Sequence, residues 1–337
     1  YYANVGVKPL DVDLSVAPPD IFDHAIPPGG LDCLVATPPC TAFSRANPSN
    51  HLRDDPRNAL VDRVEAWAGH LRPRTILMEN ARELLRGAHA GHFERLAARL
   101  GQMGYGIHAQ VHQLSRFGLP QRRERAIVIA VMGRTPIGLE ELWRGRALPK
   151  GPTVAGALAR LARWREANKN APHDACVSFG AEVAARVAAT PANGGSWVDV
   201  AKNPLLRHLC TPSCLARFNN QDFGSHPDVY GRMHADKQAP TIKRECAHPG
   251  NGRYLHPFLD RLLTVQEMAA LQGFPFHWDF TATNVVSRYR AIGDAVPPLI
   301  AWQMGACVEA ALGTDPFRLP LAMPDCSLDE CLKTDLP

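Results

Sequence analysis

Cys40 has the side chain best suited to nucleophilic chemistry in the first part of the chain. It follows two consecutive prolines, whose rings fix the backbone φ angle and stiffen the loop that carries the thiol. A thiol becomes a nucleophile where nearby cations favour the thiolate, and Arg45, Arg123 and Arg125 are candidates for supplying that field. Residue type alone favours another interpretation, because most cysteines act as small buried hydrophobes. The case for Cys40 therefore depends on what accompanies it in the sequence.

Two further groups of polar residues could share a site with this thiol. Glu79 and Asn80 follow one apolar run, and an arginine-rich stretch at 121–125 precedes another. A carboxylate beside arginines can hold or transfer a proton. The less specific interpretation is that Glu79 caps a helix and that the arginines form a solvated patch.

The elements that must position these groups are buried strands that alternate with helices. The strand-like runs lie at 31–36, 75–78 and 126–131, and helical spacing is present at 59–71 and 92–100. Such alternation predicts an α/β fold built on a parallel sheet. In an open sheet of this kind, functional groups gather just past the carboxyl ends of the strands, where Cys40 and Glu79 stand.

The composition is that of a globular chain. The 337 residues are 45% hydrophobic and 21% charged, which is too apolar for a disordered protein. No run of about 18 apolar residues is present that could span a bilayer. A chain of this length exceeds what one compact core usually holds, so we expect two lobes.

The net charge of +4 is distributed unevenly along the chain. Residues 131–260 contain 17 Lys and Arg against 11 Asp and Glu, and this segment is also rich in Pro, Gly, Asn and His. A basic, irregular middle segment is what a module that binds a polyanion would show. Charge alone, however, favours a solvated surface.

The nine cysteines are odd in number and irregular in spacing. Free thiols in a reducing compartment are therefore expected rather than a disulfide framework. His208, Cys210 and Cys214 form the one short cluster that could bind zinc, but no second pair at ligand spacing accompanies it. We therefore expect no metal site.

The order of the short motifs is more specific than any one of them. The motifs are Pro-Pro-Cys40 with Phe43-Ser44, Glu79-Asn80, Gln-Arg-Arg-Glu-Arg at 121–125, and later segments at 261–267, 271–275 and 292–298. This series, which extends from residue 1 to about residue 312, resembles the ordered motifs of the cytosine-C5 DNA methyltransferases. The resemblance implies a Rossmann-like, S-adenosylmethionine-dependent methyltransferase sheet with a smaller, irregular target-recognition domain.

The resemblance also implies a role for each of the first groups. The Cys40 thiolate would add to C6 of cytosine, so that C5 can take a methyl group from S-adenosylmethionine. Glu79 would hold a proton against N3 and hydrogen-bond the exocyclic amine, which requires a raised pKa or a tight pocket. Arg125, with Arg123 beside it, would anchor the carbonyl of the base. Loss of the C5 proton and β-elimination would then release the thiol.

The target base is stacked inside duplex DNA, so it must be turned out into the pocket while a second lobe grips the DNA. By resemblance, 133–260 is the target-recognition domain, 1–132 is the catalytic domain, 261–313 returns to that domain, and 314–337 is a tail. The implied DNA contacts are Ser44, Arg45, Arg232, Thr241, Lys243 and Arg244. The expected setting is a restriction-modification system in a prokaryotic cytoplasm, associated with the nucleoid and not with a membrane.

The implied cofactor, S-adenosylmethionine, is matched only in part. The cofactor-side positions of the family are matched by Asp11, Val12, Leu60, Asp294 and Val296. Asp294 stands where the family usually has Asn, and no Phe-x-Gly-x-Gly loop precedes Cys40, so the catalytic domain is expected to be incomplete at its N-terminal side. Three alternatives stay open: a second polypeptide that completes the cofactor site, a non-catalytic DNA-binding relative, and an RNA cytosine methyltransferase of the same fold.

Overall fold

The computed structural model describes residues 2–39, 60–88, 90–146, 151–171, 174–223 and 228–327. The chain forms two compact units. Unit 1 comprises Tyr1–Leu114, Glu124–Ala147 and Ala301–Leu321, and unit 2 comprises Ser115–Arg123, Leu148–Ile300 and Ala322–Pro337. The sequence predicts that all of 261–313 returns to the first domain, whereas the residues up to Ile300 group with the middle of the chain.

Unit 1 is built on a four-stranded sheet. Its strands are β1 (Cys33–Ala36), β2 (Thr75–Ala81), β3 (Tyr105–Gln113) and β4 (Glu124–Met132), in the order β1-β2-β4-β3. β1 runs parallel to β2, and β4 is antiparallel to both of its neighbours. The predicted α/β class is therefore confirmed, but the sheet is mixed rather than parallel. The segment that joins β3 to β4 is shorter than the dozen or more residues of a parallel crossover, which explains the antiparallel pair.

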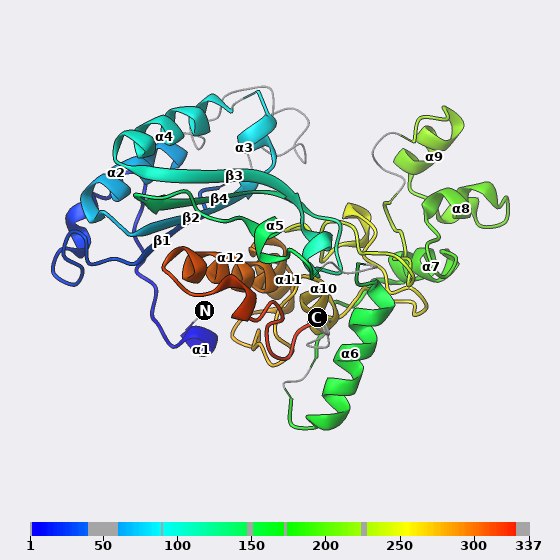
Figure 1. Ribbon diagram of the computed structural model, residues 1–337. Coiled ribbons are helices and arrows are strands. Elements are labelled where there is room, and N and C mark those ends of the chain that lie inside the picture. The colour runs from blue at the N-terminus through cyan, green and yellow to red at the C-terminus, as the bar shows by residue number, and fades with distance from the viewer. Residues whose placement is uncertain are drawn as a thin grey trace. The chain divides into compact units, whose positions relative to one another are not determined.

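The two central strands are buried on both faces. Every residue of β2 is buried, as are residues 126–131 of β4. Because side chains alternate along a strand, Ile76 and Met78 pack against α2 (Leu60–Leu71) and α4 (Gly91–Gln102), while Leu77 belongs to the opposite face. In Figure 1, α2 and α4 lie together on one side of the sheet. Burial of both faces is the physical reason for the continuous apolar runs in the sequence.

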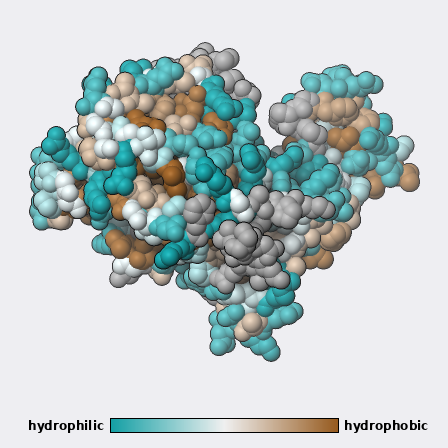
Figure 2. Space-filling model, in the orientation of Figure 1, coloured by the Kyte–Doolittle hydropathy of each residue, from teal (hydrophilic) through white to brown (hydrophobic). Residues whose placement is uncertain are grey.

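The N-terminal part of unit 1 has an apolar surface. Its exposed large side chains are Val5, Val7, Leu10, Val12, Leu14, Val16 and Val35. Val35 belongs to β1, which stands at one edge of the sheet, and it is 63% exposed. The prediction of a buried strand at 31–36 is therefore wrong about its burial, because an edge strand is not enclosed as a central one is. Figure 2 shows brown apolar patches on the body that carries the sheet, among a mostly hydrophilic surface.

Short helices complete unit 1. They are α1 (Tyr2–Val5), η1 (Pro19–Phe22), α3 (Glu83–Arg86), α5 (Leu139–Leu142), η6 (Pro316–Arg318) and the part of α12 (Pro298–Ala311) that follows Ile300. The Trp143 indole N–H donates to Gln303 Oε1 at 3.0 Å, which ties α12 to the end of α5.

Unit 2 is mostly irregular, with helices set among loops. The helices are α6 (Val154–Ala167), α7 (Ala181–Ala189), α8 (Trp197–Lys202), η4 (Arg207–Leu209), α9 (Pro212–Asn219), η5 (Pro249–Asn251), α10 (Val265–Leu271) and α11 (Val285–Asp294), with η3 (Leu114–Phe117) at its start. One apolar core joins α6 and α7 to α10 and α11, and includes Met233, Ile242 and Tyr289. This shared core explains why 261–300 groups with the middle of the chain.

The segment at 261–267 owes its residue types to a helix start. The Thr264 hydroxyl accepts from the Glu267 N–H at 3.2 Å, and the Glu267 carboxylate accepts from the Thr264 N–H at 2.8 Å. This reciprocal capping box satisfies two N–H groups that α10 would otherwise leave unpaired. Arg261 donates to both oxygens of the same carboxylate, at 2.6 and 2.9 Å. Burial opposes the charge of Glu267, but these partners hold its pKa below the ordinary value.

Candidate active site

Glu79 and Arg125 form an ion pair at one end of the central strands. Glu79 and Ala81 project to the same face of β2, and Ala81 pairs with Arg125 of β4, so the two charged side chains are diagonal neighbours. Arg125 Nε lies 2.8 Å from Glu79 Oε1. The side chains are 16% and 9% exposed, so water screens the pair weakly. The sheet thus brings together two of the predicted catalytic residues.

Asn80 connects this strand end with the loop that leads to Cys40. Its Nδ2 donates to the carbonyl of Pro38 at 3.0 Å, and its Oδ1 accepts from the Ala81 N–H at 2.8 Å. Asn80 is 1% exposed, so its amide group is shielded from water. Its amide therefore holds the backbone two residues before Cys40. The sequence names Asn80 only as part of a motif, and no residue pattern assigns it this role.

Three predicted residues, Cys40, Ser44 and Arg45, lie outside the described residues. The described cysteines offer a useful contrast. Burial is the main cause that raises the pKa of the thiols of Cys33, Cys176, Cys210, Cys246 and Cys307. For Cys246 and Cys307 the pKa rises to about 12. Burial therefore works against a thiolate nucleophile at these five positions.

Arg123 belongs to unit 2 and has different neighbours from Arg125. Its guanidinium donates to the carbonyl of Ile242 at 3.0 Å and to that of Ala295 at 3.5 Å. The residue is 4% exposed. Arg123 therefore joins the chain just after Thr241 to the chain just after Asp294, two positions that the sequence assigns to DNA and to the cofactor.

Two glutamines reinforce the same junction and were not singled out from the sequence. Gln121 Oε1 accepts from the Ile242 N–H at 3.0 Å, and its Nε2 donates to Gln272 Oε1 at 2.7 Å. Gln272 Nε2 in turn donates to the carbonyl of Ala295 at 2.9 Å. Both glutamines are fully buried. We call this set of contacts, among residues 120–123, 239–244, 271–273 and 292–296, the unit 2 junction.

Thr241 is held in the junction by its own hydroxyl. The hydroxyl donates to the carbonyl of Arg122 at 2.7 Å. Next to this bond, the Arg122 N–H donates to the carbonyl of Ala239 at 2.8 Å. Because a hydroxyl has a single proton, Thr241 can accept a further hydrogen bond but has no proton left for a phosphate oxygen. The Arg122 side chain is exposed at the same place.

Lys243 and Arg244 are both exposed at the edge of the junction. Arg244 forms an ion pair with Asp294, so the structure joins a predicted DNA residue to a predicted cofactor residue. Burial raises the pKa of the Asp294 carboxyl, and Arg244 opposes this shift. Gly293 has to be glycine, because a Cβ there would lie 2.3 Å from the carbonyl oxygen of Lys243.

Arg232 is buried, which does not match its predicted contact with DNA. It is 2% exposed, and its guanidinium donates to the carbonyls of Thr190, Val187 and Leu259. It also pairs with Asp260. Its donors are therefore directed at the protein, where they hold α7 against the loop at 256–260. In this position Arg232 acts on the fold of unit 2 rather than on DNA.

Within the described part of either unit, the predicted cofactor residues do not come together in one binding site. Asp11 and Val12 lie in an exposed segment without regular structure, and Leu60 is the half-buried first residue of α2. Asp294 and Val296 belong to unit 2. The glycine pair at 29–30 forms a turn, in which the Gly29 N–H donates to the end of α2. The residues present thus fit S-adenosylmethionine only in part.

Two further features of the described residues bear on the sequence predictions. No group of three or more His, Cys, Asp or Glu side chains among them could hold a metal ion, and this includes His208, Cys210 and Cys214. Within the same part of the chain, every helix is too short or too polar to cross a membrane.

Comparison with known families gives one match over nearly the whole chain. Residues 3–308 match the model of the C-5 cytosine-specific DNA methylases. The chain is 28% identical to the type II methylase M.HgiDII of Herpetosiphon aurantiacus over 274 residues, 78% of this chain and 72% of that protein. It is 27% identical to the type II methyltransferase M1.BsuMI of Bacillus subtilis over 284 residues, 81% of this chain and 59% of that protein. The chain thus spans about three-fifths of the Bacillus relative.

Solved structures with a similar fold are also methyltransferases. Entamoeba histolytica methyltransferase EhMeth is similar with a TM-score of 0.60 and 12% identity, over 93% of this chain and 87% of that one. Schizosaccharomyces pombe Dnmt2 methyltransferase is similar with a TM-score of 0.57 and 14% identity, over the same shares. At these identities the likeness concerns the fold.

Proposed function

The chain belongs to the C-5 cytosine-specific DNA methylase family, and we propose that it transfers a methyl group to C5 of cytosine in duplex DNA. The observation that carries the proposal is the weakly exposed pair of Glu79 and Arg125 at the end of the central strands. A carboxylate and a guanidinium at that distance can engage the amine and carbonyl groups of one polar ring together.

In this proposal Glu79 binds the target cytosine at N3 and at its exocyclic amine. Arg125 donates to the carbonyl oxygen at C2 and keeps the Glu79 carboxylate in place, since its Nε lies 2.8 Å from that carboxylate. A proton held between Glu79 and N3 would withdraw electrons from the ring, which favours attack at C6. The Cys40 thiolate is the proposed nucleophile at C6.

Asn80 supports this arrangement as a positioning residue. Its hydrogen bond to Pro38 ties the loop before Cys40 to the strand that carries Glu79. A nucleophile and a carboxylate that act on one ring must keep a fixed separation, because misplacement by about 1 Å can reduce a rate about a hundredfold. The methyl donor of this proposal is S-adenosylmethionine, which supplies an electrophilic methyl sulfonium group when bound.

Unit 2 supplies the proposed contacts to the DNA backbone. Lys243, Arg244 and Arg122 are exposed cations at one junction, and each can meet a phosphate oxygen. Arg123 has its guanidinium directed at the carbonyls of Ile242 and Ala295, so we assign it a positioning role rather than contact with the base. The comparisons do not support a second polypeptide, and the proposal does not include one.

Methyl transfer from tritiated S-adenosylmethionine to unmethylated duplex DNA tests the proposal directly. The expected result is acid-stable label in the DNA with the unchanged chain, and none with Cys40→Ala. A second substrate, single-stranded RNA of the same sequence, tests the RNA methyltransferase alternative.

A duplex that contains 5-fluorocytosine tests the nucleophile separately. The fluorine prevents the final elimination, so the chain should remain attached to the DNA and migrate as an adduct under denaturing conditions. An adduct that still forms with Cys40→Ala would contradict the assignment of Cys40. Label in RNA at a higher rate than in DNA would contradict the proposed substrate.

A further inference from the structure

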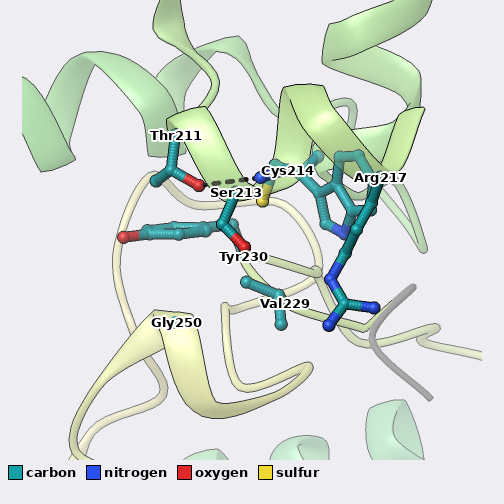
Figure 3. A pocket seen from close by; sticks show the side chains of 8 residues that line it. Thr211, Ser213, Cys214, Arg217, Val229, Tyr230 and Gly250 are labelled. Atoms are coloured by element: carbon teal, nitrogen blue, oxygen red, sulfur yellow. Dashed lines mark hydrogen bonds between the residues drawn. The ribbon is translucent and has the colours of Figure 1, made fainter. Parts of the chain in front are cut away.

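Unit 2 contains a cavity that none of the proposed roles uses. Its volume is about 240 Å³, and it lies between α8, α9 and the segment around Tyr230. The residues around it are Trp197, Thr211, Ser213, Cys214, Arg217, Val229, Tyr230 and Gly250 (Figure 3). Pockets for drug-sized ligands measure about 300–1,000 Å³, so this cavity is suited to a smaller group.

Tyr230 forms one wall and is held from several directions. Its backbone has φ +50°, a left-handed conformation that is rare for an aromatic residue. Its N–H donates to the carbonyl of Pro249 at 2.7 Å, and its hydroxyl accepts from Arg186 at 3.1 Å. The Arg186 guanidinium also lies 4.9 Å from the ring centroid. An unfavourable backbone conformation maintained by this many contacts indicates that the position of the ring matters.

The opposite part of the cavity is polar. Ser213 and Arg217 stand four residues apart on α9 and therefore project from the same face of that helix. In Figure 3 the Ser213 side chain and the Arg217 guanidinium lie on either side of Val229. Within the described part of the chain, neither side chain has a hydrogen bond or an ion pair. Thr211, in contrast, accepts from the Cys214 N–H at 3.2 Å as the N-cap of α9.

The lining of this cavity fits a ligand that is a flat ring with polar atoms along one edge. Tyr230 and Val229 offer the aromatic and apolar part of the wall, whereas Trp197 is 1% exposed and belongs to the core behind it, and Arg217 offers a fork of donors at one side. Arginine pairs in this way with two acceptors in a plane, and the O6/N7 edge of guanine is its most frequent partner among bases. A carboxylate or phosphate alone would satisfy Arg217 but would not make use of the aromatic wall.

From this we propose that the cavity binds one nucleobase of the DNA substrate, turned out of its stack, with guanine preferred. This base is distinct from the cytosine that is methylated, and the inference rests on the proposed function for its substrate, DNA. The Arg217 guanidinium donates to the two acceptors of the base edge, and the Ser213 hydroxyl completes the polar side. Tyr230 covers the face of the ring, as aromatic side chains do in pockets for extruded bases.

Binding of free nucleotides to the full chain tests the cavity without any methyl transfer. The probes are dGMP, dAMP, dCMP and TMP, and binding is followed by saturation-transfer NMR. We expect dGMP to bind most tightly, and Arg217→Ala to weaken its binding about tenfold. Lys202→Ala is the matched control, because it removes one exposed positive charge from the same part of unit 2 without lining the cavity. This control should leave dGMP binding unchanged.

The outcomes separate this inference from the proposed function. Binding of dGMP that Arg217→Ala does not change, or that Lys202→Ala weakens equally, would overturn the cavity assignment, even if the chain methylates DNA. Binding of dGMP that depends on Arg217 would support it, even if no methyl transfer were found. If the chain is active, Arg217→Ala should also relax its sequence preference at one guanine, as read by bisulfite sequencing of methylated host DNA.

Discussion

The strand end in unit 1 and the unit 2 junction both contain an arginine from the stretch at 121–125, but in different surroundings. Arg125 faces the carboxylate of Glu79 at 2.8 Å. Arg123 donates to main-chain carbonyls that follow Thr241 and Asp294. The first setting leaves polar atoms that a ligand can engage, and the second directs the donors at the protein itself.

Arginines of one short motif can thus have different functions, according to what their guanidinium groups contact. A guanidinium paired with a weakly exposed carboxylate can act on a substrate, because the two groups can bind the donors and acceptors of one polar ring together. A guanidinium that holds carbonyls from distant segments acts on the fold, because loss of it leaves those carbonyls unpaired. Substitutions in the two regions should therefore affect activity and stability in opposite proportions.

The largest expected effect is on activity, at the strand end. Glu79→Gln keeps the shape of the side chain but removes its charge and its ability to hold a proton against N3. We expect kcat to fall about 10²- to 10⁴-fold, the range of general acid-base contributions. Thermal stability should also fall, because Arg125 loses its charged partner, but the loss in kcat should be the larger effect. A variant that loses stability but keeps kcat within tenfold of the original would show that Glu79 acts on the fold rather than on a substrate.

The second effect is on stability, at the junction. Arg123→Ala removes hydrogen bonds from a charged donor to two carbonyls, so the free energy of unfolding should fall by about 3 kcal/mol. Arg122→Ala, at the exposed neighbouring position, is the control and should change it by less than about 0.5 kcal/mol. Urea unfolding measures both. Equal losses for the two variants would show that the buried contacts of Arg123 do not stabilise the junction.

A smaller effect should appear in the pH dependence of stability. The pKa of Glu267 in the folded chain lies below its ordinary value of 4.5. Its ion pair therefore stabilises the folded state above that pH, and this contribution is lost as the pH falls through the lowered pKa. Glu267→Gln should thus be less stable than the original at pH 7, and the difference should shrink as the pH falls below 4.5. Unfolding followed across this range would contradict the assignment if the difference stayed constant.

The smallest effect on stability is expected from the exposed pair of Arg244 and Asp294. Exposed ion pairs contribute about 1 kcal/mol or less, so Arg244→Ala should leave unfolding nearly unchanged. DNA affinity should fall, and the salt dependence of log K should lose about one unit of slope, as expected for one phosphate contact. An unchanged salt slope would show that Arg244, like Arg123, has a structural role and does not contact a phosphate.

The central strands and the helices α2 and α4 could be predicted because their signals are local. The apolar runs at 75–78 and 126–131 are continuous, since both faces of these strands are covered. The direction of β4 and the exposure of Val35 could not be predicted in this way, because both depend on which strands become neighbours. Strand order is a property of the whole sheet.

The candidate site was only partly predictable for a similar reason. The residue types of Glu79 and Arg125 predict that they could act together, and the sheet brings them together. The burial of Arg232 and the contacts of Gln121 depend on segments far away in the chain, which leave no local pattern. The expected roles of Cys40 and the cofactor residues stay predictions.

The exposed apolar side chains near the start of the chain affect how readily copies of the chain associate in solution. Aliphatic residues alternate there with Asp11 and Asp13, close in the sequence to an edge strand that offers unpaired backbone groups. Such charges act as gatekeepers against strand-to-strand association. Hydrogen bonds from Ser15 lower the pKa of Asp13, so this gatekeeper keeps its charge into more acidic solution than an ordinary aspartate.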